Sequence, residues 1–293
     1  MVHFVFEFGK HNPKKKLDLV EDQKALIMPI GDIHYGSRNW PEHKFKIHLE
    51  WGMDRGAYFF GMGDYLDAFS DSQRALIGPM RDSAKELMDD MMKERALKLI
   101  DLLQPTRGRW IGFLEGNHRY DFRDGKSADQ LIARYMESKF LGTDAIVRFK
   151  FDGVPRGHHE ADCVLFAHHG TGSAQTQGGT LNKVENMLKA FDADIYLMGH
   201  SHSKVAAPID QQHITPDGVH THRTKLFART GSWLLAYSST EPLSLDEPAV
   251  SSRGTYVEQK SLIPSALGSL AIGLSFEQIH QSKYFRPLIH ISL

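Results

Sequence analysis

The stretch "ALIMPIGDIH", residues 25–34, is a short apolar run that ends in an aspartate and a histidine two positions apart. Near-continuous hydrophobicity over so few residues, followed by a glycine, is typical of a strand buried on both faces. On an extended segment, residues two apart point to the same face, so Asp32 and His34 are expected to lie side by side. The run therefore predicts a buried strand that delivers two metal-binding groups to one site.

Four more runs of the same kind follow along the chain. They are "AYFFGMGD" (57–64), "RWIGFLEGNH" (109–118), "CVLFAHH" (163–169) and "IYLMGHSH" (195–202). Helices are expected between them, over 83–104, over 126–140 after a Ser-x-x-Gln capping pattern, and over 181–194. In the first of these, apolar residues recur at helical spacing (Met92, Ala96, Leu99 and Leu103). Strands that alternate with helices predict an α/β fold.

The texture of the chain changes after residue 202. Segments 225–239 and 268–277 read as strands without a helix between them, which favours an antiparallel portion. No stretch has the composition of an interdomain linker. We therefore expect residues 1–293 to form a single domain, with its motifs within about 25–235 and the C-terminal strands completing the second sheet.

Composition excludes several classes of protein. The chain has 293 residues, of which 41% are hydrophobic and 24% charged, as in ordinary globular proteins. The net charge of −1 provides no bulk attraction to nucleic acid or to an anionic membrane. The single cysteine, Cys163, excludes an intramolecular disulfide and a thiolate metal cluster. Without an apolar run of about 18 residues or a secretory signal, the chain is expected to be cytoplasmic and not membrane-bound. The sequence does not indicate an oligomeric state.

All five apolar runs end in side chains that can bind a metal. The candidate ligands are Asp32, His34, Asp64, Asn117, one of the pair His168/His169, His200 and His202. Ligands gather at the carboxyl ends of strands in α/β sheets. Aspartate, asparagine and histidine without cysteine suit borderline or harder ions such as Mn²⁺, Fe, Zn²⁺ or Co²⁺. We expect Mn²⁺, with Fe, Zn²⁺, Co²⁺ or Ni²⁺ as alternatives. Seven donors exceed the needs of one ion and fit two divalent ions about 3.5–4 Å apart that share a bridging carboxylate.

These motifs also carry a family resemblance. "GDIHYG" (31–36), "GDYLD" (63–67), "GNHR" (116–119) and "GHSH" (199–202), in this order, resemble the calcineurin-like metallophosphoesterase superfamily. The resemblance covers roughly residues 25–235. It implies an α/β fold, namely a four-layer α/β/β/α sandwich of mixed sheets with a dinuclear metal site at the strand ends. It also implies hydrolysis of phosphoesters.

The resemblance assigns a role to each matching residue. Asp32, His34 and His202 would bind the first metal. Asn117, one histidine of the 168/169 pair and His200 would bind the second, and Asp64 would bridge the two. His118 would assist the leaving group in catalysis. Arg119 and Arg38 are candidates for contact with a phosphate oxygen that does not react.

The fragment "FAHHG" (166–170) leaves two alternatives for one ligand. Neighbouring side chains on a strand point to opposite faces, so His168 and His169 are not expected to serve the same site. In the superfamily the ligand is usually the first polar residue after the strand, which favours His168. Some members have the ligand directly before glycine, which would select His169.

Several functions fit this site. A phosphodiesterase is favoured, because a site without an evident cluster of arginine and lysine suits a substrate with one negative charge. The alternatives are a phosphomonoesterase, which includes protein phosphatases, and a manganese-dependent DNA nuclease, although the bulk charge does not indicate nucleic acid. A catalytically silent binding scaffold is the least expected, since the set of metal ligands is complete.

Overall fold

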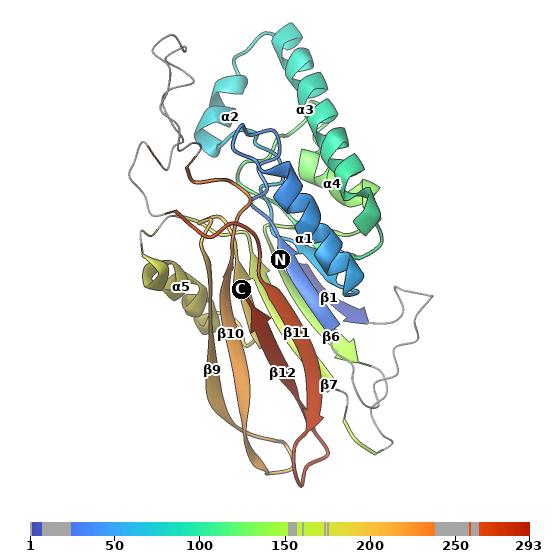
Figure 1. The fold of residues 1–293 in the computed structure, drawn as a ribbon, viewed down its shortest axis with the longest axis vertical. Coiled ribbons are helices and arrows are strands. Elements are labelled where there is room, and N and C mark those ends of the chain that lie inside the picture. The colour runs from blue at the N-terminus through green and yellow to red at the C-terminus, as the bar shows by residue number, and fades with distance from the viewer. Residues whose placement is uncertain are drawn as a thin grey trace.

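The computed structural model describes residues 2–7, 25–151, 157–159, 161–172, 174, 176–237, 258 and 264–293. Within these residues the chain is mixed α/β, and its strands form two six-stranded sheets (Figure 1). Sheet I has the order β12-β11-β2-β3-β4-β5, and sheet II has the order β1-β6-β7-β8-β10-β9. Both sheets mix parallel and antiparallel neighbours.

Sheet I contains the first three expected strands. Its parallel part consists of β2 (Ala25–Ile30), β3 (Tyr58–Gly61), β4 (Trp110–Leu114) and β5 (Phe140–Gly142). Every residue of β3 and β4 is buried, which explains why their sequences do not alternate between apolar and polar residues. The antiparallel strands β11 (Ala271–Gln278) and β12 (Phe285–Ser292) extend the sheet beside β2.

Sheet II contains the other two expected strands, β7 (Ala161–His168) and β8 (Ile195–Met198). Its remaining strands are β1 (Val2–Glu7), β6 (Asp144–Phe151), β9 (Lys204–Ile214) and β10 (His220–Thr230). The strand expected over 225–239 differs from the one observed: β10 begins earlier, at His220, and ends at Thr230. It begins earlier because it pairs with β9 along its whole length.

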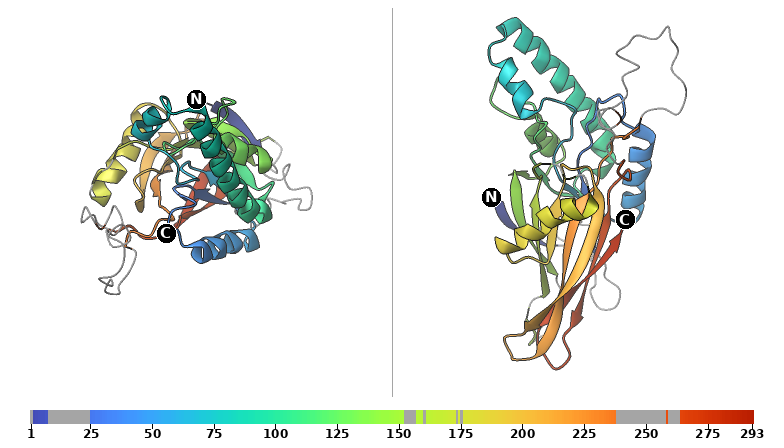
Figure 2. Two further views of the ribbon diagram at one scale, coloured as in Figure 1. Left: turned by 90° about the horizontal axis from the view of Figure 1, so that it is seen from above. Right: turned by 90° about the vertical axis from the view of Figure 1, so that its left-hand side faces the viewer.

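Helices pack on the outer side of each sheet (Figures 1 and 2). On sheet I lie α1 (Glu42–Asp54), α3 (Asp82–Leu103) and α4 (Ala128–Tyr135), with the short α2 (Asp71–Ile77) beyond them; α5 (Gln177–Glu185) lies on sheet II. α3 agrees with the helix expected over 83–104 and buries its four spaced apolar residues. α4 begins at the expected capping box but is shorter than 126–140, and α5 begins before 181 and continues as a 3₁₀ turn at Asn186–Lys189. A second 3₁₀ turn, Gln104–Thr106, follows α3.

Three apolar clusters hold these elements together. The first lies between the sheets and joins residues such as Ile27 and Phe60 of sheet I to Leu165 and Leu197 of sheet II. The second packs α1, α3 and α4 on the other face of sheet I, and the third packs α5 on sheet II around Phe166. The carboxyl ends of β2, β3 and β4 meet those of β7 and β8 at one end of the two sheets.

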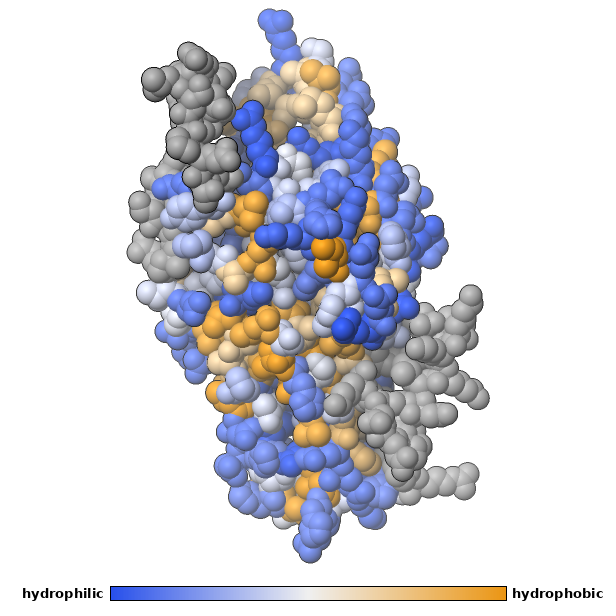
Figure 3. All heavy atoms as spheres, viewed as in Figure 1, coloured by the Kyte–Doolittle hydropathy of each residue, from blue (hydrophilic) through white to orange (hydrophobic). Residues whose placement is uncertain are grey.

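The molecule is elongated, with α2 and α3 extending beyond the sheets at one end and the β9–β10 hairpin at the other (Figure 2). On the face drawn in Figure 1, the largest apolar area crosses the middle of the surface, and hydrophilic residues dominate the hairpin end (Figure 3). Among the described residues, no helix combines the length and apolar character needed to cross a bilayer.

Candidate metal centre

Five loops bring the candidate ligands together. They follow β2, β3 and β4 of sheet I and β7 and β8 of sheet II. Two groups of side chains result, one made of Asp32, His34 and His202 and the other of Asp64, His169 and His200. Within each group, one ligand atom from every residue lies within 4.8 Å of the others.

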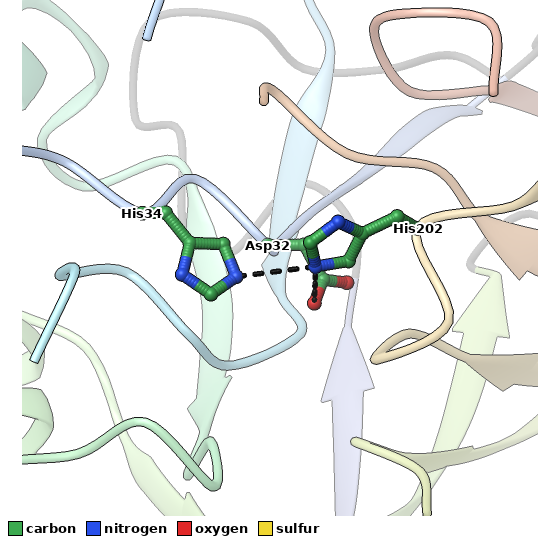
Figure 4. A group of neighbouring side chains, drawn as sticks. All are labelled: Asp32, His34 and His202. Atoms are coloured by element: carbon green, nitrogen blue, oxygen red, sulfur yellow. Dashed lines mark hydrogen bonds and ion pairs between the residues drawn. The ribbon is translucent and has the colours of Figure 1, made fainter. Parts of the chain in front are cut away.

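In the first group, the side chains of Asp32, His34 and His202 point toward one another (Figure 4). His34 Nε2 lies 3.2 Å from His202 Nε2, which in turn lies 3.5 Å from Asp32 Oδ1. Asp32 is fully buried, and its Oδ1 has no hydrogen-bond partner among the described residues. Burial raises the pKa of Asp32 to about 6 and lowers that of His202 to about 3. A cation would satisfy the lone carboxylate oxygen and the two imidazoles, so this donor set fits a divalent metal.

The side chain of Asn117 contacts both histidines of the second group. The Oδ1 of Asn117 lies 2.9 Å from His169 Nε2 and 2.6 Å from His200 Nδ1. The other ring nitrogen of His169, Nδ1, lies 2.7 Å from the carbonyl oxygen of Met62, which directs Nε2 toward the site. Burial lowers the pKa of His200 to about 4. Burial acts in the same direction on His169, but the carboxylates of Asp64 and Asp32 outweigh it and raise the pKa of His169 to about 9.

Asp64 belongs to the second group and also faces the first. Its Oδ2 is 3.3 Å from His169 Nε2 in the second group and 3.8 Å from His34 Nε2 in the first. Its Oδ1 accepts a hydrogen bond of 2.7 Å from the backbone N–H of His118. Although burial raises the pKa of Asp64, His169 and His34 lower it well below its ordinary value. One ionised carboxylate oxygen thus faces both sets of donors.

The structure corrects the preference for His168. The imidazole within the site is His169, and His168 belongs to neither group. Cys163, Leu165 and Ala167 face the core between the sheets, and His169 continues this alternation at the end of β7. His168 has the opposite parity and shares the α5 side with Phe166, where its Nδ1 accepts a hydrogen bond of 2.7 Å from the N–H of Gly170.

The remaining predicted residues lie at different distances from the groups. The ring of His118 is 5.1 Å from that of His34, and its buried Nδ1 has no hydrogen-bond partner in the described part of the chain. Burial lowers the pKa of His118, with His34 and His169 acting in the same direction. The Nε of Arg119 lies 3.6 Å from Glu115 and 3.4 Å from Asp121. Arg38 is exposed on the loop that follows β2.

The site has an unusual backbone. Five of the candidate ligands have a positive φ, a conformation that residues other than glycine seldom adopt; they are Asp32 (46°), His34 (48°), Asp64 (50°), His200 (67°) and His202 (56°). Close backbone approaches explain the glycines of the motifs. A Cβ on Gly116 would lie 2.1 Å from the backbone nitrogen of Asp64, and one on Gly63 would lie 2.6 Å from His169 Nδ1.

Supporting residues outside the motifs were missed by sequence reasoning. Asp129, buried in the first turn of α4, accepts a hydrogen bond of 3.1 Å from the N–H of Gly116. Arg74 donates to the carbonyl of Asn117 at 2.7 Å, so two side chains hold the "GNHR" loop. Neither has a signal in the sequence beyond its place on a helix. Asp67, by contrast, lies within "GDYLD", and its Oδ1 is 3.6 Å from His34 Nδ1.

Comparisons with known proteins gave results only at the level of structure. No family model and no curated protein matches the chain. Vacuolar protein sorting 29 from Cryptosporidium parvum aligns over 92% of this chain and 99% of its own, with 12% identity and a TM-score of 0.34. A predicted phosphoesterase from Streptococcus pneumoniae aligns over 92% and 100%, with 12% identity and a TM-score of 0.32.

A calcineurin-like phosphoesterase from Bacillus subtilis aligns over 91% of this chain and 90% of its own, with 11% identity and a TM-score of 0.33. TM-scores this low carry no argument about fold or function, both of which have to rest on the chain's own residues.

Proposed function

We propose that this chain is a metal-dependent phosphoester hydrolase with two divalent cations bound side by side. One observation carries the proposal: five loops from two sheets bring two groups of potential metal-binding side chains next to each other, with one oxygen of Asp64 facing both. A centre of this kind suits phosphoester hydrolysis, in which both the attacking and the leaving oxygen need stabilisation.

The assignment of ligands follows the two groups. Asp32, His34 and His202 hold the first ion, and Asn117, His169 and His200 hold the second, with Asp64 bridging both. Mn²⁺ is our first choice, with Fe, Zn²⁺, Co²⁺ and Ni²⁺ as alternatives for a site of oxygen and imidazole donors. When bound, such ions lower the pKa of a water molecule between them and neutralise the phosphoryl oxygens.

His118 is our candidate for assistance to the leaving group. Its backbone N–H is fixed by Asp64, and its ring packs edge-on against that of His34, so the side chain stands at the border of the centre. Because burial lowers the pKa of His118, its ring is mostly neutral at pH 7 in the free protein. A phosphate group bound nearby would raise this pKa and favour the protonated form that donates to a departing alkoxide.

We infer that the layers follow the order α/β/β/α. Support comes from the three apolar clusters, one between the sheets and one beneath the helices on either side. The substrate is proposed to be a phosphodiester. Arg119 is engaged with two carboxylates, which reduces its ability to neutralise the second charge of a monoester.

Hydrolysis of bis-p-nitrophenyl phosphate and p-nitrophenyl phosphate with added Mn²⁺ tests the proposal, with metal content measured in parallel. We expect two Mn²⁺ per chain and faster turnover of the diester. Faster turnover of the monoester would favour the phosphatase alternative, and degradation of DNA would favour the nuclease. Bound metal without turnover of any of these substrates would favour the binding scaffold, and a chain that binds no metal would refute the proposal. The cytoplasmic location stays a prediction.

A further inference from the structure

Arg229 is a buried cation beside the centre that none of the motifs includes. It is the penultimate residue of β10, and its side chain is 1% exposed. Its Nε donates to the carbonyl of Thr180 in α5 at 2.9 Å, and its Nη1 donates to the carbonyl of Gly199 at 2.8 Å. Burial lowers the pKa of Arg229 to about 10, so the guanidinium remains charged at neutral pH.

The contact with Gly199 acts on a single peptide unit of the "GHSH" loop. The carbonyl of the Gly199–His200 peptide accepts from Arg229, and its N–H donates to Asp32 Oδ2 at 2.9 Å. Both polar ends of this peptide are therefore held by buried side chains. The peptide leads directly into His200, which has a φ of 67°. A strained conformation of this kind persists only where the surroundings fix it.

Stability alone does not account for an arginine at this position. Its Nη2 is buried and has no hydrogen-bond partner in the described part of the chain. Its hydrogen bonds go to neutral carbonyls, and the attraction of the Asp32 carboxylate does not outweigh the effect of burial on its pKa. A buried guanidinium of this kind is often no more stabilising than an apolar side chain of similar volume. What the arginine provides is a rigid fork of donors that joins α5 to the loop carrying His200.

We propose that Arg229 is a positioning residue that holds His200 in its ligating orientation by fixing the Gly199–His200 peptide. The consequence for metal affinity rests on the proposed function, whereas the effect on the peptide does not. Thr180 anchors the other end of the fork, so α5 contributes to the site without supplying a ligand. Loss of the fork releases His200 and weakens the second metal position, while Asp32, His34 and the first position are retained.

Arg229→Gln and Arg229→Lys test this, with Arg223→Gln as a matched control. Arg223 also lies on β10 and pairs with the buried Asp194, with a hydrogen bond of 2.7 Å from Nη2, but it does not contact the site. Removal of a residue that supports a ligand typically lowers metal affinity about 10- to 100-fold. We expect a loss of this size at the second Mn²⁺ position in Arg229→Gln and a smaller loss in Arg229→Lys, which keeps the charge. Arg223→Gln is expected to lower stability and keep both affinities; unchanged affinity in both Arg229 variants would overturn the proposal.

Hydrogen exchange at the His200 amide, measured without metal, separates this proposal from the proposed function. We expect exchange about tenfold faster in Arg229→Gln than in Arg223→Gln, because one hydrogen bond that holds the peptide is lost. If Arg229→Gln does not fold, the same comparison is made with Arg229→Lys. If the wild-type protein binds no metal but exchange is accelerated in Arg229→Gln, the metal centre is refuted and the positioning role is kept. Equal exchange in the Arg229 variants and the control would refute the positioning role.

Discussion

Replacement of His169 and of His168 by alanine distinguishes two neighbouring residues with different expected roles. His169 Nε2 faces Asn117 and Asp64, and its Nδ1 faces the carbonyl of Met62. His168 lies on the opposite side of β7, where its Nδ1 accepts from the N–H of Gly170. In the proposed centre His169→Ala would remove one ligand of the second metal position, whereas His168→Ala would remove one neutral hydrogen bond outside the centre.

The expected losses of metal affinity in the two variants differ enough to show which histidine is the ligand. Four protein ligands together contribute about 10–16 kcal/mol in structural zinc sites, so one ligand accounts for about 2.5–4 kcal/mol. At 1.4 kcal/mol per factor of ten, His169→Ala should weaken the second metal about 60- to 700-fold. The lost hydrogen bond in His168→Ala should lower the free energy of unfolding by about 1 kcal/mol and leave metal affinity unchanged.

Titration with Mn²⁺ in competition with a chelator of known affinity provides the measurement, and denaturant unfolding without metal reports the stability of each variant. We expect His169→Ala to keep one tight Mn²⁺ position and His168→Ala to keep two. The opposite pattern, with the second ion lost from His168→Ala and retained by His169→Ala, would show that the alternation of β7 was assigned to the wrong faces.

Three further outcomes are expected. A metal ion binds only the neutral form of His169, whose pKa is raised to about 9, so protons compete with the metal below that pH. The affinity of the second metal position should therefore rise about tenfold per pH unit from pH 7 to 9. An affinity that does not change with pH in chelator competition would contradict this. Asp64→Ala should lose both ions in a metal analysis, and retention of two would exclude a bridging role. His118→Ala should keep both ions but slow esters with poor leaving groups most, so an equal effect across a series of aryl esters would argue against leaving-group assistance.

The parts of the fold visible in the sequence are those whose elements are buried in a regular way. β3 and β4 are buried at every position, and α3 buries one spaced stripe, so both patterns stand out in the sequence. β9 has no such pattern: its last seven residues are exposed, and it forms a strand because it pairs with β10. α5 begins at Gln177 despite two glycines, because Thr176 caps it by accepting a hydrogen bond from the N–H of Gly179. Pairing and capping of this kind depend on context that composition does not reveal.

The candidate ligands stand out in the sequence for a similar reason, apart from one choice. In "CVLFAHH" both faces of the strand are apolar, so alternation separates His168 from His169 without telling which face lies between the sheets. Only the packing of Leu165 against sheet I and of Phe166 against α5 resolves this. Arg229 and Asp129 could not be predicted for a different reason: each supports the site through a backbone group of another loop, 30 and 13 positions away in the sequence, and such a contact leaves no pattern in the sequence.

The backbone of the centre itself argues for function over stability. A left-handed conformation costs a residue other than glycine about 1–2 kcal/mol, and somewhat less for aspartate. The three histidines among the five candidate ligands therefore cost roughly 3–6 kcal/mol, and the two aspartates add somewhat less each, which together is a large part of the stability of a typical domain. Backbone hydrogen bonds stabilise these strained conformations. The N–H of Trp233 donates to the carbonyl of Asp32, and the N–H of His34 donates to the carbonyl of Asp64. A chain selected only to fold would place glycine at these positions; side chains there are explained if each one must reach a shared ion.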